Sequence, residues 1–347
     1  MDEALEQFFA NQPSWALGVE ILAILAILGK AADWLVSEAV VLSERSGLPK
    51  VIIGATVVSL GTTAPEAAVS VLAALQGNPE VALGNATGSI ICDTGLILGV
   101  ACLILPLKLP RQIVNRQGWL QFGAGILLVA ACWPWDGGNP FKTGGVLPQW
   151  LGVVFLVLLA GYLYVSVRWA RLAGNSITLE EFEGDASASL PYVLGKLLFA
   201  VSIVVASSHV LIYAITETAE RFGVPSTIVA ATLVAFGTSL PELVTAVTAA
   251  RKDHGDLAVG NIIGADILNV LFVAGMSAAV TPGGLEAHKS LFQVYFPGMI
   301  IVLIVFRVGV TLSKERMQRP FGAILLFVYI AAMALSFAVL GVPDPPH

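Results

Sequence analysis

The sequence has few charged side chains. Asp, Glu, Lys and Arg together make up 12% of its 347 residues, against about 25% in an ordinary soluble domain. So few charges cannot cover the surface of a water-soluble globule of this size. Apolar residues make up 56% and the mean hydropathy is +0.84, so most of the chain is expected to face lipid. This balance argues against a secreted enzyme, a nucleic-acid-binding protein and a disordered scaffold.

Residues that build soft metal sites or leader peptides are also scarce. The three cysteines (Cys92, Cys102 and Cys132) lie in apolar runs without metal-site spacing, and the four His are scattered, so no zinc site is expected. The N-terminal segment MDEALEQFFANQPS is acidic and lacks a basic stretch, which argues against a cleavable signal peptide. No recognisable nucleophile motif is present, so we expect neither an enzyme nor a bound cofactor.

Apolar runs of membrane-crossing length recur along the chain and predict an all-α membrane protein with ten transmembrane helices. Backbone polar groups find no water in lipid, so helices are the expected spanning structure, and the alternating strands of a barrel are absent. The predicted spans are 15–43, 50–76, 80–105, 117–134, 148–167, 192–220, 224–250, 256–280, 290–310 and 320–341.

The basic residues set the expected orientation. Of the 18 Lys and Arg, only Lys142, Arg221 and Lys289 fall in outer segments when the N-terminus is placed outside. Lys30 lies within the first span, which leaves 14 on inner loops and helix ends. By the positive-inside rule both termini are expected outside, and the polar stretch 168–191 is expected to be a cytoplasmic linker.

Two pairs of segments repeat along the chain at one common offset. Residues 54–66 (GATVVSLGTTAPE) match 230–242 (AATLVAFGTSLPE) at 7 of 13 positions. Residues 84–93 (GNATGSIICD) match 260–269 (GNIIGADILN) at 4 of 10 positions. The same offset serves both pairs without a gap, so the chain is expected to contain an internal duplication.

Each duplicated unit holds five predicted spans, and an odd number inverts the second unit in the membrane. The sequence therefore predicts two inverted five-helix repeats, 1–167 and 192–347, joined by the linker 168–191. Secondary transporters often have this architecture, and their ion sites lie near the bilayer midplane at the repeat interface.

Four carboxylates lie within these apolar spans, namely Glu66, Asp93, Glu242 and Asp266. Each costs roughly 2.5–3.5 kcal/mol at mid-membrane when unpaired. No Lys or Arg in the second, third, seventh or eighth span lies deep enough to neutralise them. The expected compensator is a cation from outside the chain, or protons. Asp266 aligns with the apolar Ile90 and is left out of the predicted site.

Each first block surrounds its glutamate with neutral oxygens. Pro65 and Pro241 lack an N–H and free carbonyl groups one turn earlier, and the carbonyls of Ser59 and Ala235 lie nearby. The polar side chains of the blocks that we expect to take part with the glutamates are Thr62, Thr63, Thr238, Ser239, Ser89, Asp93 and Asn269. Such an all-oxygen set suits Ca²⁺ and, by the same hard-ion argument, Na⁺.

Two further features of the second blocks are repeated. Asn85 and Asn261 are repeat-mates, for which interhelical hydrogen bonding and ion ligation are both left open. The glycines of these blocks form two small-xxx-small pairs, which are expected to let helices approach closely. They are Gly84, Gly88, Gly260 and Gly264.

Two copies of G-T-[ST]-x-P-E, each followed by G-N-x-x-G, resemble the α-repeats of the Na⁺/Ca²⁺ exchanger family, within the cation/Ca²⁺ antiporter superfamily, in its compact prokaryotic form. The resemblance implies a site between the second, third, seventh and eighth helices with Glu66 and Glu242 as the main Ca²⁺ ligands. It implies further ligands at the polar side chains of both blocks and at the carbonyls of Ser59 and Ala235. It also implies that the first and sixth helices slide past the core.

The second blocks depart from the family pattern G-S-N. Residues 88–90 read G-S-I and residues 264–266 read G-A-D, so Ala265 lacks the hydroxyl that the family offers to Na⁺. The polar residue four positions on is Asp93 in the first repeat and Asn269 in the second. A third carboxylate in the motif suits either tight Ca²⁺ binding or a bound proton.

The predicted function is a secondary active antiporter exchanging Ca²⁺ for Na⁺ in a prokaryotic inner membrane, with lipid and these ions as its partners. One alternative is Ca²⁺/H⁺ exchange at the same site, in which a pH gradient without Na⁺ drives uptake. A cation channel is the alternative from another class, and the duplicated broken helices disfavour it.

Overall fold

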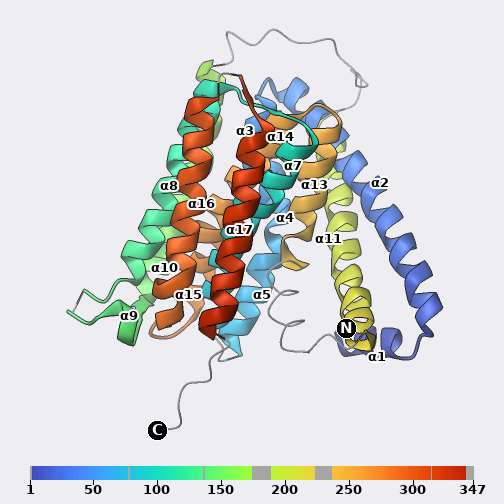
Figure 1. The fold of residues 1–347 in the computed structure, drawn as a ribbon. Helices are drawn as coiled ribbons and strands as arrows, with labels where there is room; N and C mark the ends of the chain where they lie inside the picture. Colours follow the sequence, from blue (N-terminus) through green and yellow to red (C-terminus); the bar gives the residue numbers. More distant parts are fainter. Residues whose placement is uncertain are drawn as a thin grey trace.

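The computed structural model describes residues 2–76, 79–135, 137–173, 189–222, 237–313 and 315–340. Long helices run side by side across the molecule, and several are interrupted by π-helical stretches, labelled η (Figure 1). In chain order the helical elements are α1 (Asp2–Ala10), α2 (Ser14–Ser46), α3 (Lys50–Ile53), η1 (Gly54–Val58), α4 (Ser59–Thr62), α5 (Ala64–Leu75), α6 (Pro79–Ile91), η2 (Cys92–Ile97), α7 (Leu98–Ile104), α8 (Arg111–Cys132), α9 (Pro140–Thr143), α10 (Gln149–Ala173), α11 (Leu190–Arg221), α13 (Leu240–Arg251), α14 (Gly255–Leu268), η4 (Asn269–Ala274), α15 (Gly275–Val280), η5 (Leu291–Tyr295), α16 (Phe296–Leu312) and α17 (Arg319–Leu340).

Seven helices among the described residues are long and apolar enough to cross a membrane, or eight if two helices that meet at 43° count as one span. The bent pair is Lys50–Thr62 with Ala64–Leu75, and its break lies inside the first GTTAPE motif. The predicted span 117–134 coincides with α8, which is not among the seven, and 224–250 lies partly outside the described ranges. The chain is thus a multi-pass membrane protein, and the count of ten spans stays a prediction.

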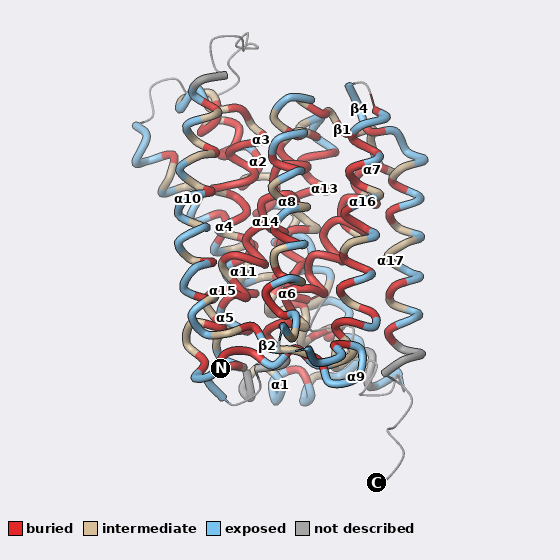
Figure 2. Tube along the Cα trace, turned by 90° about the vertical axis from the view of Figure 1, so that its left-hand side faces the viewer, coloured by how far each residue is buried: buried red, intermediate tan, exposed pale blue. Residues whose placement is uncertain are grey.

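Two short antiparallel sheets, which the sequence does not predict, join the connections between helices. In one, β1 (Leu107–Lys108) pairs with β4 (Arg316–Met317). In the other, β2 (Gly145–Leu147) pairs with β3 (Leu285–Ala287). The two sheets lie at opposite ends of the helices (Figure 2). Each sheet pairs a connection of the first half of the chain with one of the second half.

Helix boundaries recur at the offset found in the sequence. α5 begins at Ala64 and α13 begins at its repeat-mate, Leu240, and each has 12 residues. The third and eighth predicted spans each contain a π-helical stretch of six residues, η2 and η4. Such wide turns are rare and occur frequently at functional sites. Within the described residues, the duplicated segments therefore share the start of α5 and α13 and the π-helical interruption of η2 and η4.

The central helices are buried and one pair of helices stands apart from them. The most hydrophobic part of Gly255–Val280 is 94% buried, whereas the corresponding parts of α2 and α11 are 28% and 33% buried. α2 and α11 pack along each other at one side of the molecule (Figure 1). Lys196 Nζ lies 3.1 Å from Glu38 Oε1 in this pair, and Arg221 Nη1 donates to Ser14 Oγ at 3.3 Å. The two helices thus form a unit held together by polar contacts as well as by packing.

Glycine lets α14 approach the second predicted span closely. A Cβ atom at Gly260 would collide with the Val51 backbone, and one at Gly264 would lie 2.5 Å from Ala55 Cα. Gly84, the repeat-mate of Gly260, has no such neighbour within 4 Å of its Cβ position. The close approach expected from the glycine pairs is therefore present at Gly260 and Gly264, and Gly84 does not share it.

We expect Gly260→Ala to destabilise the protein by about 1–3 kcal/mol, because the added methyl group must displace backbone atoms. Gly84→Ala is the matched control, since it adds the same methyl group to the same motif position in open space. Its stability should be equal to that of the parent or slightly higher, because Ala favours helix over Gly. Thermal unfolding in one detergent measures both, and equal midpoints for the two variants would contradict the packing described here.

Candidate ion site

The two motif glutamates occupy equivalent places at the starts of two helices. Glu66 lies in the first turn of α5 and Glu242 in the first turn of α13, and each is 0% exposed. Pro65 and Pro241 stand immediately before them, at positions where a helix needs no N–H donor. A helix N-terminus carries partial positive charge, so both carboxyl groups lie where the backbone stabilises an anion.

A hydrogen bond connects the two motif blocks directly. Thr63, at the break between α4 and α5, donates its hydroxyl hydrogen to Glu242 Oε1 at 3.2 Å, and both residues are fully buried. The two residues are 179 positions apart in the chain. The structure thus brings the GTTAPE block of the first repeat into contact with the glutamate of the second.

Many buried oxygens at this place have no hydrogen-bond partner within the described part of the chain. An unsatisfied buried polar group costs about 1–3 kcal/mol, so a concentration of such groups calls for a ligand or another explanation. Six of the predicted ligand residues have at least one such oxygen, namely Glu66, Ser89, Asp93, Ser239, Glu242 and Asn269. Residues outside the predicted set, such as Thr245, Asn261 and Asp266, also have one.

The π-helical stretches coincide with the second-block ligands. Asp93 is the second residue of η2, and Asn269 is the first residue of η4. Both carboxyl oxygens of Asp93 and both polar atoms of the Asn269 amide are buried and unpartnered within the described ranges. The sequence places these residues correctly in the repeat, but it contains no local signal for the wide helical turns.

The donor atoms of this site favour a hard cation. In the described ranges, no three His, Cys, Asp or Glu side chains are close enough together to hold a metal ion. A cation here would therefore need hydroxyl and amide oxygens besides the carboxylates. Oxygen ligands in a flexible set suit Ca²⁺ and Na⁺ better than transition metals.

The remaining predicted ligands are placed less completely. The Ser59 carbonyl accepts the Thr63 N–H at 2.8 Å and the Thr62 hydroxyl at 3.4 Å, so it keeps helical partners in this structure. Thr238 is buried and donates to Asn85 Oδ1 at 3.3 Å. Ala235 lies outside the described residues.

Asp266 belongs to a separate polar network that the sequence does not reveal. Its Oδ2 atom accepts hydrogen bonds from Thr94 Oγ1 and from Gln121 Nε2, each at 2.5 Å. Gln121 Nε2 also donates to Thr94 Oγ1 at 3.1 Å, and all three side chains are buried. Gln121 comes from α8, and the only sequence signal for it is a polar residue within an apolar span. Asp266 therefore has donors of its own at Oδ2, whereas its Oδ1 atom is buried without a partner in the described residues.

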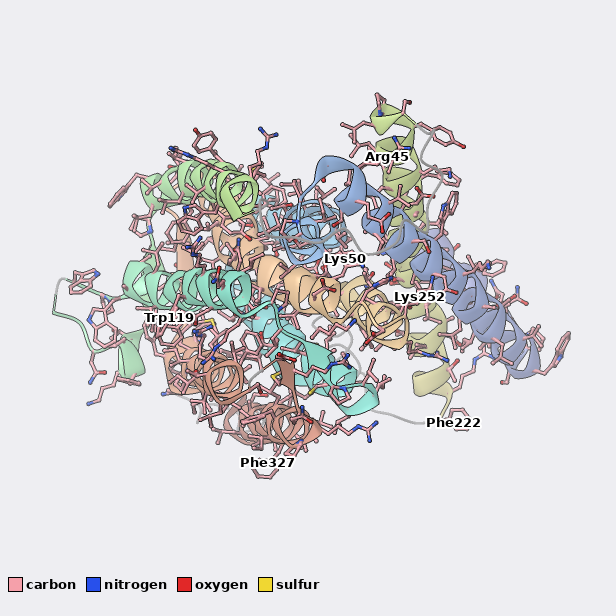
Figure 3. All side chains as sticks on the ribbon, turned by 90° about the horizontal axis from the view of Figure 1, so that it is seen from above. Arg45, Lys50, Trp119, Phe222, Lys252 and Phe327 are labelled. Carbon is pink, nitrogen blue, oxygen red and sulfur yellow. The ribbon has the colours of Figure 1, made fainter. Side chains whose placement is uncertain are left out.

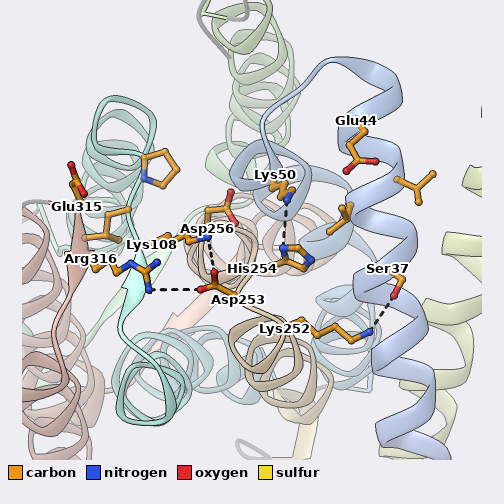
Figure 4. Close-up of a pocket in the computed structure, with 14 residues that line it drawn as sticks. Ser37, Glu44, Lys50, Lys108, Lys252, Asp253, His254, Asp256, Glu315 and Arg316 are labelled. Atoms are coloured by element: carbon orange, nitrogen blue, oxygen red, sulfur yellow. Dashed lines mark hydrogen bonds and ion pairs between the residues drawn. The ribbon is translucent and has the colours of Figure 1, made fainter. Parts of the chain in front are cut away.

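A cavity of about 920 Å³ is lined by charged side chains from several connections between helices, and none of the motif carboxylates belongs to its lining (Figure 4). Lys50 and Lys252 belong to its lining and are seen from above in Figure 3. Asp253 lies 2.8 Å from Lys108 and 3.8 Å from Arg316. The hydrogen bond from Lys108 holds the pKa of Asp253 below its usual range. The sequence predicts these connections on the inner side.

Comparison with known families matches most of the chain. Residues 16–168 and 192–338 match the family model described as sodium/calcium exchanger protein. The two matched segments flank the polar stretch between residues 168 and 192.

Individual relatives are similar over nearly their whole length. The inner membrane protein YrbG of Escherichia coli K12 is 32% identical over 93% of this chain and 97% of its own. The sodium/calcium exchanger MaX1 of Methanosarcina acetivorans is 28% identical over 92% of this chain and 98% of its own. A structure of the sodium-calcium exchanger NCX_Mj, soaked with zero Na⁺ and Ca²⁺, has a TM-score of 0.74 and 25% identity, covering 92% and 99% of the two chains. The helical arrangement is thus shared with a solved exchanger.

Removing one carboxyl group at a time should separate the candidate ligand Asp93 from the hydrogen-bonded Asp266. Asp266→Leu leaves the buried donors Thr94 and Gln121 without their acceptor, so we expect a loss of about 1–3 kcal/mol of stability with the response to Ca²⁺ retained. Asp93→Asn removes an unpaired buried charge, so we expect unchanged or higher stability without Ca²⁺ and a smaller Ca²⁺-induced rise in the melting temperature. Thermal unfolding with and without Ca²⁺ measures both effects. If instead the Asp266 variant lost the response to Ca²⁺ and the Asp93 variant kept it, Asp266 rather than Asp93 would be the ligand.

Proposed function

Because this chain belongs to the sodium/calcium exchanger family, we propose that it is a secondary active antiporter that exchanges Ca²⁺ for Na⁺ across the membrane. The observation that carries the proposal is the contact between the two motif blocks, where Thr63 donates to Glu242. Glu66 and Glu242 are fully buried in a chain that spans lipid. Two uncompensated carboxylates there are costly, and a bound cation removes that cost.

The proposed ligands are the oxygens of both repeats. Glu66 and Glu242 are the main Ca²⁺ ligands and also contact Na⁺. The unpartnered side-chain oxygens in the first turns of α5, η2, α13 and η4 support this assignment. The other proposed ligands are the side chains of Thr62, Thr63, Thr238, Ser239, Ser89, Asp93 and Asn269, with the backbone carbonyls of Ser59 and Ala235.

In the proposed mechanism Na⁺ and Ca²⁺ compete for overlapping oxygens. The ion-free site carries several negative charges, and moving it between access states without a counter-ion is unfavourable. Either ion neutralises the site and permits the change of state, so each ion shifts the same conformational equilibrium by its differential affinity. α2 and α11 are the proposed moving unit, because they pack on each other and are less buried than the central helices.

The proposed topology is ten spans in two inverted repeats, 1–167 and 192–347, with both termini outside. The recurrence of helix boundaries between α5 and α13 supports the repeat. α1 and the last turn of α17 lie at the same end of the molecule (Figure 1), which supports placing both ends of the chain on one side. The excess of basic residues at the other end supports the orientation.

Glu66→Gln and Glu242→Gln test the proposed site. We expect each variant, reconstituted in liposomes, to lose Na⁺-gradient-driven uptake of radiolabelled Ca²⁺ by at least about a hundredfold, because a neutral amide cannot balance the charge of Ca²⁺. Glu217→Gln is the matched control, since Glu217 pairs with Arg221 at 2.6 Å near a helix end. Uptake at the parent rate in both motif variants would refute the proposed site.

Ca²⁺/H⁺ exchange at the same site is a second candidate, and the third motif carboxyl group, Asp93, favours it. With Na⁺ as the coupling ion, a Na⁺ gradient drives Ca²⁺ uptake when the pH gradient is collapsed by an ionophore. With H⁺ as the coupling ion, a pH gradient drives uptake in Na⁺-free medium. We expect the first result, and parallel assays on one batch of liposomes distinguish the two.

A further inference from the structure

The two motif asparagines make different contacts in this structure. Asn85 Nδ2 donates to Ser70 Oγ at 3.0 Å and lies 3.5 Å from the backbone carbonyl oxygen of Glu66. Asn85 Oδ1 accepts the hydroxyl hydrogen of Thr238 at 3.3 Å. These side chains are buried, with Asn85 only 5% exposed. Asn85 thus connects the glutamate-bearing helix of the first repeat to a proposed ligand residue of the second.

Asn261, the repeat-mate of Asn85, makes no such contacts. It is 0% exposed, and neither polar atom of its amide has a hydrogen-bond partner within the described residues. The position equivalent to Thr238 is Thr62, whose hydroxyl makes a bond of 3.4 Å to a carbonyl of its own helix. The position equivalent to Ser70 is Ala246, which has no hydroxyl.

This asymmetry has a simple meaning in a chain built from two related halves. A contact made in one repeat and absent from the other is a conformational difference between them. We take the opposite access state to be the one in which the two repeats have exchanged these conformations while the α2–α11 unit moves past them. The exchange would break the contacts of Asn85 and give Asn261 the partners that it lacks here. One buried asparagine therefore becomes unsatisfied as the other becomes satisfied, which keeps the two states close in energy.

We propose that Asn85 and Asn261 are paired positioning residues that hold the ion ligands alternately. Asn85 holds Thr238 and the Glu66 backbone in the state of this structure, and Asn261 holds Thr62 and the Glu242 backbone in the opposite state. The proposal rests on the proposed exchange function, because it assumes two access states. The two states then differ in free energy, because Ser70 accepts a hydrogen bond from Asn85 whereas Ala246 has no hydroxyl to offer Asn261.

The pair Ser70 and Ala246 provides the test. Ser70→Ala weakens the contacts of Asn85, and Ala246→Ser adds the missing partner of Asn261, so both should shift the protein away from the state of this structure. We expect each to change the ratio of the two states about 2- to 12-fold, the effect of one hydrogen bond, and the double variant to shift it further. Asn261→Ala should shift the ratio the opposite way.

Spin labels at Val19→Cys in α2 and Leu75→Cys in α5 report the state through their distance distribution in nanodiscs with Na⁺ present, because the occupied site can change state. Both positions are exposed, at 59% and 63%, and the native cysteines are buried. Thr87→Ala and Ala249→Ser are matched controls that remove and add a buried hydroxyl outside the contacts of either asparagine. They should leave the distribution unchanged.

Shifts of opposite sign for Ser70→Ala and Ala246→Ser would overturn the inference, as would a distribution that none of the variants alters. If one variant does not fold, the sign of the other still decides. The distance measurement needs no transport. Failure of Na⁺-driven uptake in the parent protein would refute the proposed function, and a normal exchange rate with unmoved distances would refute only the roles of the asparagines.

Discussion

Burial of carboxylate charge inside a membrane is the constraint on which the rest of this structure depends. Glu66, Asp93 and Glu242 are fully buried, and none of them forms an ion pair in the described part of the chain. Uncompensated charge at mid-membrane is tolerated only where the fold supplies dipoles, hydrogen-bond donors or a bound cation. The helix starts at both glutamates, the hydroxyl groups beside them and the unpartnered oxygens all serve this requirement.

The same constraint explains where the backbone is irregular. Broken and π-helical backbone within a membrane is tolerated only where protein rather than lipid surrounds it. The break at Thr63 and the wide turns η2 and η4 lie in buried segments, and more lipid-exposed helices such as α10 and α17 are continuous. The glycines of α14 permit this arrangement, because they let its backbone touch Val51 and Ala55. Regular outer helices therefore shield an irregular, oxygen-rich centre.

Much of this organisation can be predicted from the sequence, because the same motifs occur in both repeats. Apolar runs show the approximate positions of most helices, and the common offset of the repeated blocks points to Glu66 and Glu242. Contacts between distant residues cannot be predicted in this way. The donors to Asp266 come from two other helices, and the sheets join connections far apart in the chain. Asn85 and Asn261 share one motif, yet Asn85 has hydrogen-bond partners and the Asn261 amide has none among the described residues. Each of these contacts depends on how the helices pack, which a local sequence pattern does not reveal.

The differences between the repeats follow a physical rule. Charge at the proposed site concerns both halves together, because its proposed ligands come from both repeats. The repeat-mates Asp93 and Asn269 are an acid and an amide, so this pair of positions contributes one carboxyl group to the proposed site. The total charge would be the same if the acid were in the second repeat and the amide in the first. The hydrogen bond between Asn85 and Ser70 lies within the first repeat. Its absence from the second repeat changes the relative free energy of the two access states. A difference of about 1 kcal/mol biases such an equilibrium without trapping it, whereas roughly 5 kcal/mol would hold the protein almost entirely in one state. Exchange therefore tolerates divergence of single contacts between the repeats but requires their combined charge to stay matched to the ions.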